Sequence, residues 1–174
     1  VGCGHGHSTL LMAKAFPASR FFGFDTHAAS IEAARRNAKE QGLEGRVHFE
    51  VARATDYRDE GYGLICFFDT LHDLGDPVAA ARHAAHALAP GGTVLLVEPF
   101  AHDRVEDNLT VPGRLYYAAS SMICCAHAIS EGGTLVLGAQ AGPERLAEVF
   151  RKAGFTHFRR AAETPFNLVF EVRR

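Results

Sequence analysis

The sequence predicts an α/β fold with a mostly parallel sheet and helices on both of its faces. Along most of the 174 residues, short apolar segments of strand type alternate with longer segments of helical periodicity, and this alternation is typical of parallel strands joined by helices. A glycine-rich loop at residues 1–7 leads directly into a helical pattern. About twenty residues further on, an apolar segment ends in Asp25, at the spacing where nucleotide-binding α/β folds place a carboxylate that binds ribose hydroxyls.

In the opening loop, Gly2, Gly4 and Gly6 stand at every second position. Glycine has no Cβ, so it lets the backbone turn sharply from strand to helix and approach a ligand closely. A dinucleotide-binding loop would place its third glycine one position later, where this chain has His7, so the spacing disfavours NAD and FAD. No strand precedes the loop in this sequence. We therefore expect the chain to be the downstream part of a longer protein, with the first strand missing.

The first elements have clear start and stop signals. We expect a helix at 8–16, because Pro17 stops it, and then a short buried strand at 20–24. The next helix, 28–41, ends at Gly42, a residue suited to the position after a helix. Its buried face is predicted to carry Ile31, Ala34 and Ala38.

The middle of the chain continues the alternation. Residues 46–51 read as a strand, and residues 62–68 are apolar without alternation, as in a strand buried on both faces near the centre of a sheet. A helix at 77–88 begins with proline at its first position. Residues 90–92 (Pro-Gly-Gly) predict a turn before the strand at 93–98.

The last third of the chain begins with its least regular stretch, residues 99–141. One helix is predicted there, at 115–129, with Leu115, Ala119, Met122, Ile123 and Ala126 on one face. A further helix at 143–153 ends at Gly154, and two final strands, 155–160 and 166–172, are joined around Thr164 and Pro165.

Composition bounds the class of protein. A chain with 47% hydrophobic residues suits one globular domain with a sizeable core. The formal net charge of -2, with scattered Lys and Arg, argues against nucleic acid and anionic membrane surfaces as partners. No apolar run approaches the roughly 20 residues that span a bilayer, and no signal peptide is visible.

The cysteines indicate a reducing compartment. Cys3, Cys66, Cys124 and Cys125 show no framework of the secreted type, so we expect a cytoplasmic protein. Two groups contain metal-binding residue types, namely Cys3 with His5 and His7, and Cys124 and Cys125 with His127. Neither matches the ligand spacing of standard zinc sites, so we expect no metal site.

The order of these features resembles that of the class I S-adenosylmethionine-dependent methyltransferases over nearly the whole chain. Residues 1–6 are similar to the first motif of that family, and Phe24-Asp25 to the acidic end of its second strand. Residues 68–74 resemble the segment after the fourth strand, and residues 88–98 the turn and strand of the fifth. The resemblance implies a Rossmann-like sheet that ends in an antiparallel hairpin, and a methyltransferase catalytic domain over 1–174 that is incomplete at its N-terminus.

The resemblance also implies roles for particular residues and S-adenosylmethionine as the cofactor. Gly2, Cys3 and Gly4 of the loop would pass close to the methionine part of the cofactor. Asp25 would hold the ribose hydroxyls, and Thr26 and Ala54 would flank the adenine. Phe68 and Asp69 would face the methionine amino group and the sulfonium.

Each candidate residue also has an ordinary structural role open to it. Asp25 would equally serve to cap the following helix. His72 lies at the expected mouth of the pocket and is a candidate catalytic base, although a single histidine is more often a packed or hydrogen-bonded residue. Glu98 ends a strand at the ligand edge of the sheet, where it would either orient an acceptor or bind nearby backbone groups.

The leading hypothesis is methyl transfer to a small molecule, with His72 and Glu98 as catalytic residues. The stretch 99–141 is apolar with scattered polar groups, as expected of part of an acceptor pocket, and no basic surface for RNA or DNA is evident. A homodimer is possible. The alternatives are a nicotinamide-dependent oxidoreductase, and a non-catalytic cofactor-binding or dimerisation module that kept the fold without the chemistry.

Overall fold

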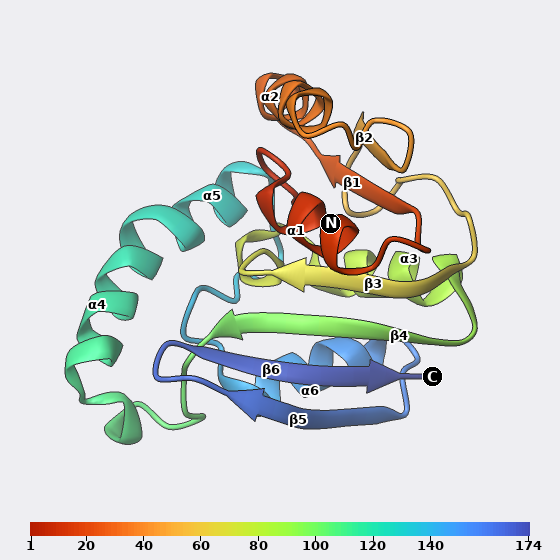
Figure 1. The fold of residues 1–174 in the computed structure, drawn as a ribbon. Coiled ribbons are helices and arrows are strands. Elements are labelled where there is room, and N and C mark those ends of the chain that lie inside the picture. The colour runs from red at the N-terminus through yellow and green to blue at the C-terminus, as the bar shows by residue number, and fades with distance from the viewer. The chain divides into compact units, whose positions relative to one another are not determined.

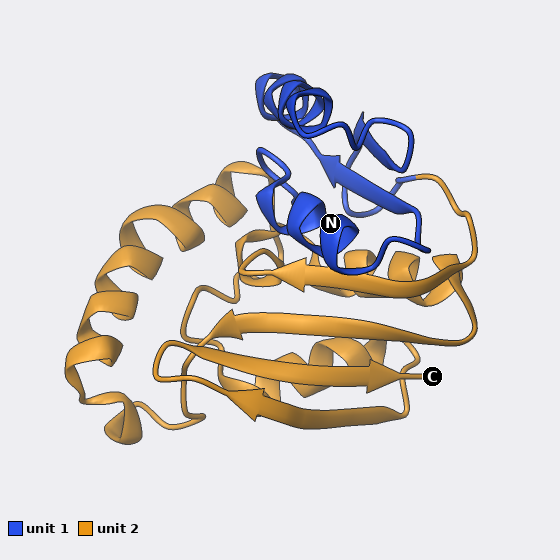
Figure 2. Cartoon of the chain, viewed as in Figure 1, with its two compact units in different colours: residues 1–57 blue, residues 58–174 orange.

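The strands form two sheets, one in each of two compact units of the chain. The computed structural model describes residues 1–174. Unit 1 is Val1–Tyr57 and unit 2 is Arg58–Arg174 (Figure 2). Unit 1 contains a two-stranded sheet of order β1-β2, and unit 2 a four-stranded sheet of order β3-β4-β6-β5. The α/β class is confirmed, while the expectation of one domain stays a prediction.

Unit 1 has the helices and strands that the local patterns predict. Its elements are α1 (His7–Ala15), β1 (Phe21–Asp25), α2 (Ala28–Glu40) and β2 (Val47–Val51) (Figure 1). The two strands are parallel, and Asp25 at the end of β1 is opposite Val51 at the end of β2. Since parallel strands end at the same edge of a sheet, the segments that follow β1 and β2 start from the same edge of the unit 1 sheet.

The core of unit 1 forms between the helices and the sheet. Ile31, Ala34 and Ala38 are buried on α2, as predicted, and they pack with Leu10 of α1 and Phe49 of β2. The Phe49 ring lies where two glycines leave room for it. A Cβ on Gly6 or on Gly23 would come within 2.5 Å of that ring.

Unit 2 contains the remaining elements. They are β3 (Tyr62–Phe68), η1 (Leu71–Asp73), α3 (Pro77–Ala87), β4 (Leu88–Pro99), η2 (Glu106–Asn108), α4 (Val111–Ala119), η3 (Ser120–Cys124), α5 (Cys125–Ser130), α6 (Gly142–Lys152), β5 (His157–Glu163) and β6 (Asn167–Arg173). β3 and β4 are parallel, whereas β6 is antiparallel to both β4 and β5. The expected C-terminal antiparallel hairpin is therefore confirmed. Figure 1 shows α3 and α6 on one side of this sheet.

The position of β3 differs from the prediction of a central strand. Within unit 2, β3 pairs only with β4 and is the edge strand of its sheet. β4 has a strand on each side and is the central strand. Ile65 and Phe67 of β3 are buried, but Leu64 is half exposed. The unbroken apolar run at residues 62–68 indicates that the strand is buried, but it does not indicate which strands lie beside it.

The expected turn at residues 90–92 is also corrected. These residues belong to β4, at a bulge in its pairing with β3. Tyr62 pairs with Leu88 and Leu64 with Thr93, so the longer β4 segment bends outward between these two pairs. Gly91 has a φ of 76°, and glycine tolerates this left-handed conformation at a bulge. Pro-Gly-Gly therefore bends a strand here and does not join two elements.

The irregular stretch is more helical than predicted. α4, η3 and α5 follow one another without a break from Val111 to Ser130, and η3 is a π-helix. Leu115, Met122 and Ile123, which were expected to share one apolar face of a helix, are each more than 60% exposed. Within Val111–Ser130, the buried side chains come from Ser120, Cys124 and Ala128. None of the helices is long and apolar enough to cross a membrane.

A larger residue at Gly23 is expected to destabilise unit 1. The Cβ of Gly23→Ala would lie 2.5 Å from Phe49 ring carbons and 3.0 Å from the Cys3 Sγ. Such overpacking costs about 1–3 kcal/mol, so the midpoint of thermal unfolding falls. Gly45→Ala is the matched control, because its Cβ would meet nothing within 4 Å. An unchanged unfolding midpoint in Gly23→Ala would show that Phe49 is not held in place.

Candidate functional site

The glycine loop in unit 1 has the backbone conformation that its sequence predicts. Gly2, Gly4 and Gly6 all have positive φ, at 66°, 51° and 78°. The amide of Cys3 donates a hydrogen bond of 3.0 Å to the carbonyl of Phe24, which fixes the loop beside the end of β1. Burial raises the pKa of the Cys3 thiol to about 11. This thiol therefore stays protonated near neutral pH and does not act as a nucleophile.

Asp25 joins the loop to the end of β1. One carboxylate oxygen accepts a hydrogen bond of 2.8 Å from the amide of Gly4, and the other accepts one of 2.9 Å from the amide of His27. Helix α2 begins at Ala28 with His27 as its N-cap, so Asp25 does not cap that helix. A carboxylate has about four acceptor positions, and two of those on Asp25 remain for a ligand.

The surroundings of Asp25 leave room for a ligand in unit 1. A Cβ on Gly4 would meet nothing within 4 Å, so the space beside this loop residue is open. No side chain caps the first amides of α1. Thr26 is exposed and Ala54 is half-buried, and the segment after β2 is tied to β1 by the Ala52 amide, which donates to the Asp25 carbonyl. These residues lie at one edge of the unit 1 sheet.

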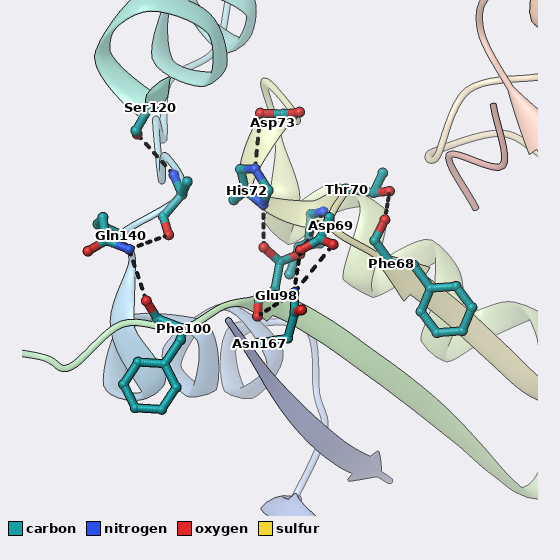
Figure 3. Close-up of polar contacts among 12 residues, drawn as sticks. Phe68, Asp69, Thr70, His72, Asp73, Glu98, Phe100, Ser120, Gln140 and Asn167 are labelled. Carbon is teal, nitrogen blue, oxygen red and sulfur yellow. Dashed lines mark hydrogen bonds and ion pairs between the residues drawn. The ribbon is translucent and has the colours of Figure 1, made fainter. Parts of the chain in front are cut away.

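In unit 2, Asp69 follows β3 in an unusual conformation. It is the only residue other than glycine with positive φ, at 47°. Its amide donates to the Val97 carbonyl at 2.8 Å, and the side-chain amide of Asn167 donates to its carboxylate at 3.0 Å (Figure 3). Burial raises the pKa of the Asp69 carboxyl, although His72 and Asn167 act in the opposite direction. Strained backbone of this kind clusters at functional sites.

His72 and Glu98 form a buried pair at the end of the parallel strands β3 and β4. Both residues are at most 4% exposed. Nδ1 of His72 donates a hydrogen bond to Oε2 of Glu98, while Oε1 of Glu98 accepts one of 2.9 Å from the amide of Leu71 (Figure 3). Glu98 thus orients the imidazole ring and accepts a hydrogen bond from a backbone amide, which is one of the two roles expected for it, while its role toward an acceptor stays a prediction.

The charges around His72 set its protonation. Burial alone would lower the pKa of His72, but the hydrogen bond and charge of Glu98, with smaller effects of Asp73 and Asp69, outweigh it and raise that pKa. Burial raises the pKa of Glu98, and His72 acts in the opposite direction. The protonation of each group therefore depends on the charge of the other.

Further donor atoms lie beside His72. Oδ1 of Asp73 is 3.3 Å from Nε2 of His72, on the side of the ring opposite Glu98. The Sγ of Cys124, the last residue of the π-helix η3, lies within 4.8 Å of a ring nitrogen of His72 and of a carboxylate oxygen of Asp73. Burial and the neighbouring Asp73 raise the pKa of Cys124 to about 12.

The structure brings most of the predicted site residues into two groups. Unit 1 gathers Gly2, Cys3, Gly4, Asp25, Thr26 and Ala54, and unit 2 gathers Asp69, His72 and Glu98. Phe68 lies half-buried directly before Asp69, and its carbonyl accepts a hydrogen bond from Thr70.

Three residues that lie in or beside the unit 2 group were not predicted as site residues from the sequence. The position of Asp73 beside His72 in the sequence was a usable signal. Asn167 and Cys124 come from distant segments of the chain, and nothing in the sequence near either residue indicates that it lies beside Asp69 or His72.

Known proteins match this chain in sequence and in fold. The 27-O-demethylrifamycin SV methyltransferase of Amycolatopsis mediterranei is 31% identical over 98 residues, which cover 55% of this chain and 36% of that protein. The S-adenosylmethionine-dependent methyltransferase SibL is 26% identical, with a TM-score of 0.71, over 99% of this chain and 48% of SibL.

A third solved protein, the O-methyltransferase NcsB1 from neocarzinostatin biosynthesis, is 24% identical with a TM-score of 0.74, over 99% of this chain and 47% of NcsB1. That structure contains S-adenosyl-L-homocysteine and 1,4-dihydroxy-2-naphthoic acid. The chain therefore spans about half the length of these solved proteins, and 36% of the length of the curated relative.

A family model described as a methyltransferase domain matches residues 1–154. The match includes the glycine loop, Asp25, and the segment that carries Asp69, His72 and Glu98. Because it covers most of the sequence, it shows the family directly: this chain belongs to the class I S-adenosylmethionine-dependent methyltransferases.

Proposed function

We propose that this chain is the cofactor-binding and catalytic part of an enzyme that transfers a methyl group from S-adenosylmethionine to a small molecule. The observation that carries the proposal is the hydrogen bond between the Gly4 amide and the Asp25 carboxylate, which joins the glycine loop to the acidic end of β1. Membership of the methyltransferase family supports the choice of cofactor over a nicotinamide.

The residues of unit 1 fit an adenosine ligand. Asp25 has free acceptor positions for ribose hydroxyls, and the open space beside Gly4 allows the backbone to approach a ligand. Thr26 and Ala54 are available at the same edge to flank the adenine. Gly2, Cys3 and Gly4 are proposed to lie against the methionine part. Phe68 and Asp69 of unit 2 are also proposed as cofactor-binding residues, on the family resemblance alone.

For methyl transfer, the main tasks of the protein are to align the acceptor with the cofactor and to remove the acceptor's proton. The bound cofactor supplies an electrophilic methyl group on a sulfonium. The protein aligns an acceptor atom with the methyl-sulfur bond, excludes water and takes the acceptor's proton where it carries one. His72 suits the last task, because Glu98 holds the proton on Nδ1 and leaves the Nε2 lone pair as the base.

A small-molecule acceptor is the class of substrate that fits best. The relatives are named for such acceptors, including 27-O-demethylrifamycin SV, and NcsB1 contains a dihydroxynaphthoic acid. We propose that the insertion at residues 99–141 forms part of the acceptor pocket. A cytoplasmic location, suggested by four free cysteines, and a homodimer stay predictions, as does the absence of nucleic acid and membrane partners.

Removing the Asp25 carboxylate is expected to weaken cofactor binding. Hydrogen bonds to charged groups contribute about 1.5–3 kcal/mol, so the dissociation constant of S-adenosylhomocysteine should rise roughly 10- to 100-fold in Asp25→Ala. Calorimetric titration of the full-length protein measures this change. Glu44→Ala, which removes an exposed carboxylate elsewhere in unit 1, is the control and should bind as the wild type does. Equal affinity in Asp25→Ala would remove Asp25 from the site.

The Glu98 carboxylate is expected to keep the pKa of His72 high. In the wild type, that pKa lies above the ordinary value of 6.5. In Glu98→Gln the charge is gone, and burial, which is the largest effect and lowers the pKa, then prevails. Imidazole NMR signals followed against pH should show His72 titrating at lower pH in Glu98→Gln than in the wild type.

His72 and Glu98 also make the free energy of unfolding depend on pH. Because the folded pKa of His72 is raised, its contribution to the free energy of unfolding is complete below pH 6.5 and is lost as pH rises through the folded pKa. Glu98→Gln should show a smaller loss over that interval. Glu148→Gln, at an exposed position on α6, is the control and should leave the His72 titration unchanged. A His72 pKa that is the same with and without the Glu98 charge would contradict this account.

A further inference from the structure

Three side chains of different chemistry meet beside the η1 segment of unit 2. A ring nitrogen of His72, a carboxylate oxygen of Asp73 and Sγ of Cys124 all lie within 4.8 Å of one another. His72 is 4% exposed and Cys124 is 8% exposed. The Asp73 side chain is 35% exposed, so the cluster is open to solvent on one side. One nitrogen, one oxygen and one sulfur donor thus lie close together, which is the donor set that zinc and similar ions accept.

Asp73 leaves an acceptor atom without a hydrogen-bond donor. Its Oδ1 is buried and receives no hydrogen bond from any group of the protein. An unsatisfied buried acceptor is destabilising unless another positive group meets it. Nε2 of His72, which carries the lone pair of the ring, lies 3.3 Å from this oxygen. Two ligand atoms of a tetrahedral zinc ion are about 3.3 Å apart, so this separation suits an ion that binds both atoms.

On the side of its ring away from Asp73, His72 has the kind of hydrogen-bond acceptor that metal-binding histidines usually have. Such histidines donate their other N–H to a carboxylate or carbonyl group, which fixes the tautomer and the ring orientation. Here Nδ1 of His72 donates to Glu98, and Glu98 is held in turn by the amide of Leu71. The ring therefore presents Nε2, with its lone pair, toward Asp73 and Cys124.

Backbone contacts hold the two ligand-bearing segments together. The amide of Gly138 donates to the His72 carbonyl at 3.2 Å, and the amide of Gly75 donates to the side chain of Glu131 at 3.2 Å. Gly75 and Gly133 lie so close that a Cβ on Gly133 would be 2.8 Å from the Gly75 backbone. These contacts hold the segment of His72 and Asp73 against residues 131–138, and Cys124 lies at the end of a π-helix, an element that is frequent at functional sites.

We propose that His72, Asp73 and Cys124 bind one divalent transition-metal ion of the zinc type, with a fourth coordination position left open. The mixed nitrogen, oxygen and sulfur donors favour Zn²⁺ or Co²⁺ over Mg²⁺ and Ca²⁺, which prefer oxygen ligands. Binding releases the thiol proton of Cys124 to solvent. The proposal departs from the expectation of no metal site, which rested on ligand spacing along the sequence, because these ligands come from segments 51 residues apart.

A bound ion and a catalytic base both need the same atom. The Nε2 lone pair of His72 either accepts a proton or binds the ion, so an ion at this site would prevent His72 from acting as a base. This consequence rests on the proposed function, whereas the binding of the ion does not.

Metal binding to the full-length protein tests the proposal. After chelator treatment and addition of Co²⁺, the wild type should hold about one ion per chain, with visible absorption of tetrahedral cobalt and a thiolate charge-transfer band. Cys124→Ala and Asp73→Asn should each weaken binding by about 100-fold or more, since removing even an outer partner of a ligand weakens it 10- to 100-fold. Cys125→Ala is the matched control, because this neighbouring thiol is not among the donor atoms, and it should bind as the wild type does.

Each result of these binding experiments either supports the metal site or overturns it. A wild type that holds no Co²⁺ or Zn²⁺ overturns the proposal, as does binding that is undiminished in Asp73→Asn, which preserves the shape of the side chain. Thermal unfolding of each variant shows whether it folds, and if Cys124→Ala does not, Asp73→Asn decides. Titration of the chelator-treated protein with S-adenosylhomocysteine reports on the proposed function separately, so failure of either proposal is recognised without the other.

Discussion

The buried carboxylate of Glu98 is the constraint on which the unit 2 site depends. A buried charge is strongly destabilising unless its oxygens accept hydrogen bonds, and here the donors are the Leu71 amide and the His72 ring. The segment after β3 must therefore turn back toward the end of β4. That turn fixes the orientation of His72, and with it the positions of Asp73 and its neighbours.

The sheets explain why residues that are far apart in sequence come together within each unit. Asp25 ends β1, Asp69 follows β3 and Glu98 lies near the end of β4. In each unit the parallel strands end at the same edge, so polar residues at strand ends gather there. The interior of each strand is left to apolar side chains such as Phe67 and Leu96, which are fully buried.

This regularity is also why much of the molecule is predictable from its sequence. Apolar periodicity and the stop signals at Pro17, Gly42 and Gly154 place the elements to within a few residues. The spacing from the glycine loop to Asp25 identifies the residues that meet through the Gly4 amide. These features are local, or depend on the fixed geometry of parallel strands.

The features that could not be predicted depend on contacts between distant segments. Asn167 reaches Asp69 across 98 positions of the sequence, and nothing local to Asn167 indicates its partner. The exposed side chains of Leu115 and Met122 follow from the way α4 and η3 lie, which helical periodicity does not determine. The bulge at residues 90–92 resembles a turn in sequence, because glycine suits both.

The central claim is that the chain binds S-adenosylmethionine and not a nicotinamide. Calorimetric titration of the full-length protein with S-adenosylhomocysteine and, separately, with NADH tests this most directly. The account predicts stoichiometric binding of S-adenosylhomocysteine and none of NADH. Binding of NADH alone would contradict it and favour an oxidoreductase, and binding of neither ligand would contradict it in favour of a fold that has lost its cofactor.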